Sequence, residues 1–376
     1  MKTTPVAILP AAVLALGSLA LAAPAKYETY TKPVKLAPYL FEMSYSDYSA
    51  DLSASFGGQG GMACSAVRNG NFYGRNLDFY YNDMAEVVVH MAAKEGRFAS
   101  VAVCGNLGVR QADVERGLSE EAFLALPGKA FDGVNERGVA ANINVVPADD
   151  TGPLTGTNPG KPRMHATSIV RFVLDRASTA AEAVKLLGDY DIFGSFGHYS
   201  MHFMINDEKE TYIVEFIDNK LTWTKQNIMV NFYHTLPEVT PFGSGVERYG
   251  ILKANYAEGA TLDGMCKLMQ RVKYSQAYDP ATKPAWYSEF VMCKGPDGRK
   301  LTTKSPREDY AGVLADMAVK NANRTRENGA ANGIWQTVHT SVYDIAARKL
   351  RLFVQEDYAR AFEFGLAAGA VTAAGK

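Results

Sequence analysis

Residues 64–79 read CSAVRNGNFYGRNLDF and contain the pattern of a β-hairpin. Two short runs of strand-forming residues flank Asn69-Gly70, a pair that is typical of the tightest hairpin turns. If this pair forms the turn, Cys64 lies directly opposite Arg75, with about 5 Å between the two Cβ atoms. A guanidinium at that distance favours a thiolate over a thiol, which is the condition for a nucleophilic cysteine. The stretch therefore predicts a hairpin that presents a reactive cysteine.

The same hairpin offers a carboxylate and a simpler interpretation. Asp78 follows Arg75 by three residues and is expected to reach the same end of the hairpin. The alternative is a half-buried structural cysteine beside a surface ion pair, and the hairpin alone does not separate the two. The residues around Cys64 do not match the cysteine motif of papain-like proteases. The choice between a catalytic and a structural Cys64 therefore depends on the rest of the chain.

The composition is that of an ordinary globular protein. The chain has 376 residues, 47% of them hydrophobic and 21% charged, and its formal net charge is -1. A near-neutral balance provides no broad basic surface for a phosphate backbone, so we expect no nucleic-acid partner. The four cysteines include no pair with zinc-finger spacing, and we expect neither a metal nor a cofactor.

The N-terminus has the features of a secretory signal. Lys2 precedes an apolar run over residues 6–23, which ends in the A-x-A pattern Ala23-Pro24-Ala25. We expect residues 1–25 to be a signal peptide and the protein to be exported, periplasmic or secreted, without stable membrane insertion. The weaker alternative is an uncleaved membrane anchor, because 18 apolar residues approach the minimum for a span.

Export would place the protein in an oxidising compartment, where cysteines can pair. Cys266 and Cys293 are candidates for a disulfide that the sequence does not decide, and Cys104 in a valine-rich strand is expected to be a buried small hydrophobe. His198 and His202 stand four residues apart, but the strand pattern that follows argues against a helical metal site. Glu215 ends an apolar strand, where we expect a structural hydrogen-bonding role.

The remaining pattern predicts a mixed α and β domain. Residues 26–61 contain scattered tyrosines and a glycine-rich end, which predicts a flexible connector, and they match no phosphate-binding loop. Helices are expected at residues 166–176 and 179–187, the second opened by a Thr179-x-x-Glu182 capping box. Strands are expected at residues 64–78, 86–92, 99–104, 139–146, 200–206 and 211–217.

Several segments together carry a resemblance to a known family. A glycine-rich stretch ends at Cys64, and Asn231 and Arg248 lie in two of the later segments. The segments are GRNLDF (74–79), FDGVNERG (131–138), HFMINDEKETYIVEF (202–216), IMVNF (228–232), GVERY (245–249) and QTVHTSVYD (336–344). In order and spacing they resemble the choloylglycine hydrolase family of linear amide hydrolases, which contains bile salt hydrolases and penicillin V acylases. This resemblance favours the catalytic interpretation of Cys64.

The resemblance implies a fold, a processing event and a reaction. The fold would be α+β, a four-layer αββα sandwich of the N-terminal nucleophile hydrolase type. Attack of the Cys64 sulfur would cut the Ala63-Cys64 bond, so that residues 26–63 are a leader removed on activation and residues 64–376 form a single amidase domain. The α-amine of Cys64 would then serve as general base, with a reference pKa of about 8. Its thiolate would attack a substrate amide and form a thioester that water hydrolyses.

The resemblance also assigns roles to the residues that match its motifs. Cys64 would be the nucleophile and, through its amine, the base. Arg75 would favour the ionised thiol, and Asp78 would orient the α-amine as the third member of a triad does. Arg248 would complete the polar set and hold Asp78 or the amine in position.

The expected oxyanion donors are less well determined. The side-chain N–H of Asn231 would be one donor, and a backbone N–H near Asn144 would be the second. The spacing from Asn135 is slightly shorter than the family pattern, so Asn142 competes with Asn144. Strand alternation places both asparagines on the same face.

The substrate class follows only in outline. The aromatic residues in Phe79-Tyr80-Tyr81 and in residues 192–203 suggest an apolar wall for a bulky or fatty acyl group, or else ordinary core aromatics. The expected partner is a small-molecule amide, and a homo-oligomer is left open. A bile salt or penicillin V amide is the first expectation. The alternatives are a fatty N-acyl amide (N-acylethanolamine, ceramide or acyl-homoserine lactone) or an exported relative without catalysis.

Overall fold

The structure is a computed structural model of one continuous chain. It describes residues 28–48, 51–53, 62–79, 84–147, 153–195, 199–235, 245–273 and 336–368. The expected signal peptide, Tyr80 and Tyr81 of the expected apolar wall, His198 and Cys293 lie outside the described residues. Within the described part, no helix is long and apolar enough to cross a bilayer.

Two large sheets form the centre of the molecule. The larger has the strand order β1-β2-β5-β6-β7-β8-β11-β12-β13 and the smaller the order β14-β3-β4-β15-β16-β17. The strands of the larger sheet are β1 (Val34–Ala37), β2 (Leu40–Tyr45), β5 (Met84–Met91), β6 (Ser100–Arg110), β7 (Ala130–Asn135), β8 (Ala140–Pro147), β11 (Tyr199–Asn206), β12 (Thr211–Ile217) and β13 (Lys220–Thr224). Those of the smaller are β14 (Ile228–Met229), β3 (Met62–Asn69), β4 (Phe72–Phe79), β15 (Gln336–Asp344), β16 (Lys349–Val354) and β17 (Phe362–Phe364). A separate parallel pair joins β9 (Arg163–His165) and β10 (Asp191–Phe193).

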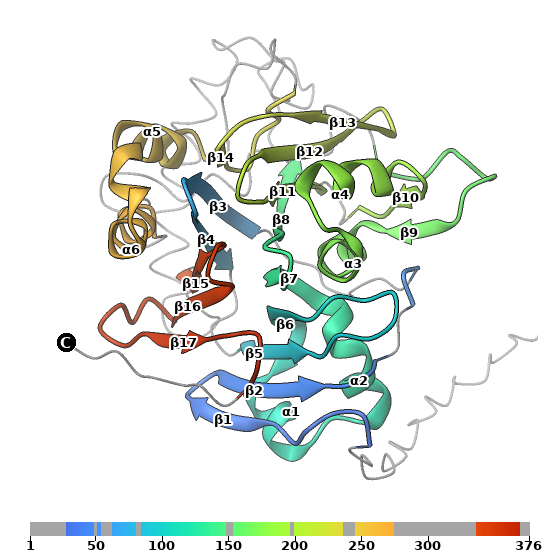
Figure 1. The fold of residues 1–376 in the computed structure, drawn as a ribbon, viewed down its shortest axis with the longest axis vertical. Helices are drawn as coiled ribbons and strands as arrows, with labels where there is room; N and C mark the ends of the chain where they lie inside the picture. Colours follow the sequence, from blue (N-terminus) through green and yellow to red (C-terminus); the bar gives the residue numbers. More distant parts are fainter. Residues whose placement is uncertain are drawn as a thin grey trace, which may run out of the picture.

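Helices cover the outer face of each sheet. On the larger sheet lie α3 (Ile169–Arg176) and α4 (Ala180–Leu187), and on the smaller lie α5 (Val246–Ala254) and α6 (Leu262–Arg271). Two further helices, α1 (Gln111–Arg116) and α2 (Glu120–Ala125), connect β6 to β7. Figure 1 shows the four layers from left to right as helices, smaller sheet, larger sheet and helices. The expected αββα sandwich is therefore confirmed for the described part of the chain.

Each interface between layers has its own apolar core. Between the sheets, Val88 and Val103 of the larger sheet are buried with Tyr73 and Tyr343 of the smaller one. Outside the larger sheet, α3 packs against Ile143 of β8, and outside the smaller one α6 packs against Val67 of β3. Each large apolar side chain buried in this way contributes about 1.5–3 kcal/mol.

The two helices expected from the sequence are present, with small differences. Residues 166–168 form a 3-10 turn before α3 begins at Ile169. Thr179 caps α4 by accepting from the backbone N–H of Glu182. The Glu182 carboxylate accepts from the N–H of Ser178 rather than that of Thr179, so the capping box is displaced by one residue.

The hairpin exists, but its predicted register is wrong by two residues. Asn69 pairs with Phe72, and Gly70 and Asn71 form the turn, with φ of Gly70 at +59°. Cys64 therefore lies opposite Leu77 rather than Arg75. The predicted turn had Asn69 and Gly70 as its two central residues, both at positive φ. In the structure, Gly70 has a positive φ, whereas Asn69 and Asn71 do not. Because a shift of two residues keeps every side chain on its face, the thiol and the guanidinium remain neighbours.

The predicted flexible connector is also wrong. Within residues 26–61, β1 and β2 form one edge of the larger sheet, and β2 pairs in parallel with β5. The side chains of Leu40, Phe41, Met43 and Tyr45 are buried. Phe41, Met43 and Tyr45 alternate with the polar Glu42 and Ser44, which is the pattern of a half-buried strand, and the prediction overlooked it.

Candidate active site

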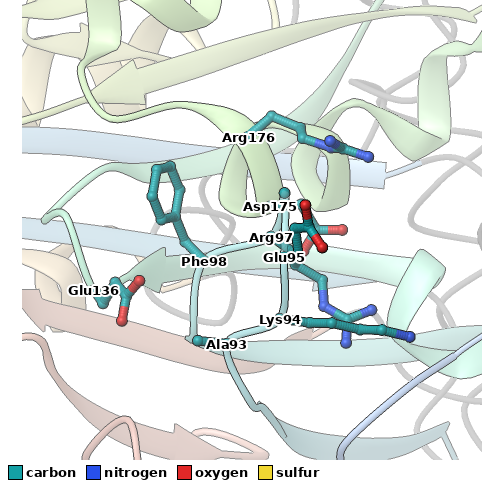
Figure 2. A pocket seen from close by; sticks show the side chains of 9 residues that line it. Ala93, Lys94, Glu95, Arg97, Phe98, Glu136, Asp175 and Arg176 are labelled. Carbon is teal, nitrogen blue, oxygen red and sulfur yellow. The ribbon is translucent and has the colours of Figure 1, made fainter.

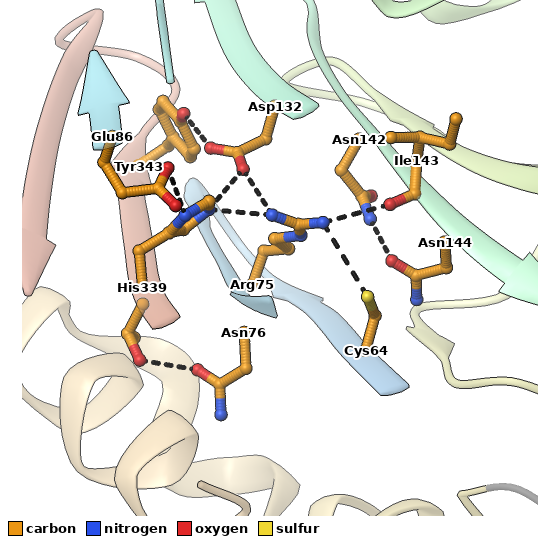
Figure 3. Close-up of polar contacts among 11 residues, drawn as sticks. Cys64, Arg75, Asn76, Glu86, Asp132, Asn142, Ile143, Asn144, His339 and Tyr343 are labelled. Atoms are coloured by element: carbon orange, nitrogen blue, oxygen red, sulfur yellow. Dashed lines mark hydrogen bonds and ion pairs between the residues drawn. The ribbon is translucent and has the colours of Figure 1, made fainter. Parts of the chain in front are cut away.

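Cys64 lies near the start of β3, in the space between the two sheets. Its side chain is fully buried. The guanidinium of Arg75 reaches it diagonally from β4, with 3.8 Å between Nη2 and Sγ (Figure 3). The same Nη2 donates to the carbonyl of Ile143 in β8, at 3.1 Å. Arg75 therefore links the thiol to the facing sheet.

The charges around Cys64 act in opposite directions on its thiol. Burial raises the pKa of the thiol above its usual value, while Arg75 lowers it and Asp78 raises it. Arg248 and the backbone N–H of Asp78 lower it further, but burial outweighs them. The expectation that Arg75 alone favours the thiolate is therefore incomplete, because in this closed site the neutral thiol is preferred.

Asn231 follows β14 and contacts the backbone of the cysteine. Its Oδ1 accepts from the N–H of Cys64 at 2.8 Å, and from Nη2 of Arg248 at 2.7 Å. Its Nδ2 donates to the carbonyl of Val145 in β8, at 2.7 Å. The side-chain nitrogen of Asn231, expected to serve as an oxyanion donor, is therefore bound to the facing sheet.

Arg248 binds several parts of the site from the first turn of α5. Its Nη1 donates to the carbonyl of Cys64 and, at 2.7 Å, to the hydroxyl of Ser65. Gly245, just before the helix, has φ of +99°, and a Cβ there would lie 2.6 Å from Cβ of Val230. A glycine at this position therefore lets α5 begin close to the segment that carries Asn231.

Asp78 lies on the other face of β4 from Arg75. Its Oδ1 accepts from the hydroxyl of Thr337 at 2.6 Å, and its Oδ2 is 3.7 Å from Nη1 of Arg248. Oδ2 is buried and has no hydrogen-bond partner among the described residues. Burial raises the pKa of Asp78 to about 6, although Arg248 and Thr337 oppose this rise. Asp78 is paired across the hairpin with Ala63, the residue that precedes the cysteine.

Asn142 and Asn144 share one face of β8, as expected. Nδ2 of Asn142 donates to Oδ1 of Asn144 at 2.8 Å, and both side chains are fully buried. The remaining atoms, Oδ1 of Asn142 and Nδ2 of Asn144, have no hydrogen-bond partner in the described part of the protein. Figure 3 shows the pair on the same side of Arg75 as Cys64.

Behind Arg75 lies a group of buried charges that the sequence did not reveal. Nη1 of Arg75 is 2.9 Å from Oδ2 of Asp132, and the same oxygen is 2.9 Å from Nε2 of His339. The other ring nitrogen of His339 is 2.9 Å from Oε2 of Glu86, and the Tyr343 hydroxyl donates to Asp132 (Figure 3). Two cations and two carboxylates thus balance one another when His339 is protonated.

The pKa directions agree with that charge state. Burial opposes the protonation of His339, but Glu86 and Asp132 raise its pKa above the usual value. A register shift in β15 places His339 beside Arg75. Before the shift Thr337 pairs with Asp78, and after it His339 pairs with Leu77, whose side chain lies on the same face of β4 as Arg75. The bulge therefore directs neighbouring residues of one strand to the two sides of the site.

Glu215 has the hydrogen-bonding role expected for it. Its carboxylate accepts from the backbone N–H groups of His234 and Thr235, and from the Thr235 hydroxyl. The ring of His202 is 3.1 Å from its Oε1. Because His234 and Thr235 follow Asn231 closely in sequence, Glu215 holds the segment that presents this asparagine.

The other expected features lie away from Cys64. Cys104 is fully buried, as predicted, and Cys266 has a free thiol. A surface pocket of about 620 Å³ lies between the β5–β6 turn and the end of α3 (Figure 2). Its charged residues are balanced in sign: Lys94, Arg97 and Arg176 against Glu95, Glu136 and Asp175. None of the residues around Cys64 lines this pocket.

The six residues expected from the sequence are thus all found around the hairpin. Cys64, Arg75, Asp78, Asn231 and Arg248 are joined by direct contacts or by one shared partner. Asn144 lies on β8, beside the carbonyl groups of Ile143 and Val145 that bind Arg75 and Asn231. The sequence analysis missed Asp132 and His339 as members of the site, although both lie inside the quoted segments at 131–138 and 336–344.

This chain is similar to proteins of known structure and to one protein family. Two solved structures are similar in part: a mutant of conjugated bile acid hydrolase from Clostridium perfringens (13% identity, TM-score 0.42, covering 83% of this chain and 96% of that one) and penicillin V acylase from Agrobacterium tumefaciens (16%, 0.41, 82% and 90%). No curated protein is similar enough to count as a match. The family model "Linear amide C-N hydrolases, choloylglycine hydrolase family" matches residues 61–235, which contain β3, β4, β8 and Asn231. In this part, the chain is similar to the choloylglycine hydrolase family of linear amide C-N hydrolases.

Proposed function

We propose that Cys64 is an N-terminal nucleophile that the protein exposes by cutting its own chain, and that it then hydrolyses a small-molecule amide through a thioester. The observation that carries this proposal is the set of contacts on the cysteine itself. Its sulfur faces Arg75, its N–H binds Asn231 and its carbonyl binds Arg248. A merely structural cysteine needs no such set of polar side chains from other elements on its sulfur, N–H and carbonyl.

The self-cleavage balances as an acyl transfer followed by hydrolysis. The Cys64 sulfur attacks the carbonyl carbon of Ala63, the C–N bond breaks, and the thiol proton passes to the nitrogen, which becomes the α-amine. Water then hydrolyses the thioester, giving the Ala63 carboxylate and the free thiol. Because Asp78 is the cross-strand partner of Ala63 and has a buried oxygen without a hydrogen bond, we infer that this oxygen receives the new ammonium group.

Catalysis on a substrate repeats the same chemistry. The α-amine takes the thiol proton, the thiolate attacks the substrate amide, and the amine leaves before water hydrolyses the thioester. Asn231 and a donor near Asn144 would stabilise the developing oxyanion once their present partners are displaced. We propose an amide with a bulky or apolar acyl group as substrate, of the bile salt or penicillin V type, and an exported location for the enzyme.

A fatty N-acyl amide remains the alternative substrate. The same thioester chemistry serves any linear amide, so the choice depends on the acyl group alone. Release of the amine from a panel of glycocholate, taurocholate, penicillin V and N-acyl substrates decides between them.

The processing is tested by the mass of the purified protein. We expect a chain that begins at Cys64, and we expect Cys64→Ala to keep Ala63-Cys64 joined and to abolish amine release. Cys104→Ala is the matched control, because it also removes a fully buried thiol but should leave cleavage and activity intact. An active wild-type protein that still carries residues before Cys64 on the same chain would contradict the mechanism.

A further inference from the structure

Part of the leader is built into the larger sheet. β2 pairs in parallel with β5 from Leu40 opposite Glu86 to Tyr45 opposite Met91. β1 covers the other side of β2, and both lie at the lower edge of the sheet in Figure 1. Without them β5 would become an edge strand with a row of unpaired backbone groups.

The apolar side chains of β2 enter both cores of the molecule. Phe41, Met43 and Tyr45 belong to the core beneath the helices of the larger sheet, together with Val87 of β5. Leu40 belongs to the core between the two sheets. Each of these side chains is at most 2% exposed, so removal of the segment would open both cores to water.

Polar contacts fix the segment that follows β2. Asp47 binds Lys94 and Arg97, two residues that line the surface pocket in Figure 2, and the Tyr48 hydroxyl donates to Asp175 in the same pocket. The contacts join this segment to the β5–β6 turn and to the end of α3. They do not depend on the bond between Ala63 and Cys64.

Two further hydrogen bonds involve residues just before and just after Asp47 and Tyr48 in the sequence. The Tyr45 hydroxyl donates to the carbonyl of Phe123, at 3.0 Å. The carbonyl of Leu52 accepts from the N–H of His165 in β9, at 2.7 Å. The segment is therefore attached to the larger sheet, to α2 and to β9, up to eleven residues before the cleavage point.

We propose that residues 28–53 stay bound after the Ala63-Cys64 bond is cut, so that the mature enzyme consists of two chains that share the larger sheet. This inference rests on the proposed self-cleavage and changes its outcome. Cleavage would free Met62 and Ala63, which continue β3 beyond the cysteine, and uncover the new amine. The remainder of the leader would serve as a permanent part of the fold rather than a segment that is discarded.

The processed protein gives the first test. Size-exclusion chromatography without denaturant should yield one peak, and mass spectrometry of that peak under denaturing conditions should show two chains divided between Ala63 and Cys64. A fully active peak that contains only the chain from Cys64 onward would overturn the proposal.

A second design separates this inference from the proposed self-cleavage. A protease site is inserted between residues 53 and 62 of the Cys64→Ala protein, which does not cut itself, and the chain is nicked there. We expect the leader to co-elute with the rest and to leave only at the urea concentration that unfolds the whole protein. Release at a much lower concentration would overturn the docking. Failure of the wild-type protein to cut itself, together with retention in the nicked protein, would refute the self-cleavage and support the docking.

Two substitutions provide a matched pair. Phe41→Asp places a charge in the core, and we expect the nicked leader to dissociate. Val34→Asp changes β1 at a side chain that is 53% exposed, and we expect the leader to stay bound. If Phe41→Asp also retains its leader, the buried face of β2 does not hold the segment. If Phe41→Asp fails to fold before nicking, Met43→Ala replaces it, with release at a lower urea concentration than wild type as the expected result.

Discussion

Asp132→Asn removes one charge from the buried group behind Arg75 and keeps the shape of the side chain. Burial raises the pKa of Asp132, but His339 and Arg75 outweigh this effect and hold it at about 2, below the usual 3.8. The difference corresponds to about 2.4 kcal/mol of stability at neutral pH. In the variant, Arg75 and His339 would face each other 2.7 Å apart without the carboxylate between them.

We expect this substitution to lower the melting temperature by about 5–10 °C, because a protein of this size loses about 2–4 °C per kcal/mol. The measurement is circular dichroism at pH 7, in the Cys64→Ala protein so that the chain stays in one piece. Because the pKa of Asp132 is depressed in the folded state, the contribution is present above pH about 3.8 and is lost as the pH falls towards 2. The gap between variant and parent should therefore narrow in acid.

Glu42→Gln is the control for that experiment. It removes a carboxylate 2.9 Å from a buried histidine, His90, without leaving two cations in contact. We expect a smaller loss than for Asp132→Asn. A melting temperature for Asp132→Asn within about 1 °C of its parent, or a loss equal to that of Glu42→Gln, would refute the role of this charge group.

Substitution of Asp78 is expected to raise stability, and substitution of Glu215 is expected to lower activity. Burial raises the pKa of Asp78 from 3.8 to about 6, so its ionisation reduces folding stability progressively between these two pH values and in full above about 6. In the Cys64→Ala protein we therefore expect Asp78→Asn to raise stability by about 3 kcal/mol in urea unfolding at pH 8 and by little at pH 4. Equal stability of the two proteins at pH 8 would contradict this reasoning. Glu215→Gln leaves too few acceptors for His234 and Thr235, and we expect kcat to fall by up to about 100-fold through displacement of Asn231. Glu210→Gln, at an exposed ion pair with Lys225 beside the same strand, should leave kcat unchanged, and equal effects of the two substitutions would exclude a specific role for Glu215.

The sequence was sufficient to predict which residues lie together around Cys64. Cys64 and Arg75 lie on one hairpin, so their proximity needed only the alternation of side chains, and an error of two residues in the register did not separate them. Asn231 and Arg248 were found through motifs alone. Their contacts with Cys64 depend on β14 and α5, whose positions no local pattern in the sequence specifies.

The features that were missed depend on contacts between distant parts of the chain. β2 pairs with β5 in parallel, and such a pairing leaves no turn or hairpin signal between the two strands. His339 reaches the site because a bulge in β15 changes the face of the strand, which shifts the alternation by one residue. Asp132 was part of a quoted motif, but the sequence did not show that its carboxylate pairs with Arg75 and His339.

The pairing of β4 with β15 also determines when, during synthesis of the chain, the surroundings of Cys64 can be completed. Thr337 and His339 join partners 259 and 264 residues earlier in the chain. At about 5–20 residues per second, a ribosome needs roughly 10–50 s to travel that distance. During this interval Asp78 lacks its hydroxyl donor and Asp132 lacks its imidazole, so the surroundings of Cys64 are incomplete. A chain that ends before β15 therefore lacks Thr337 and His339 and does not assemble these surroundings of Cys64.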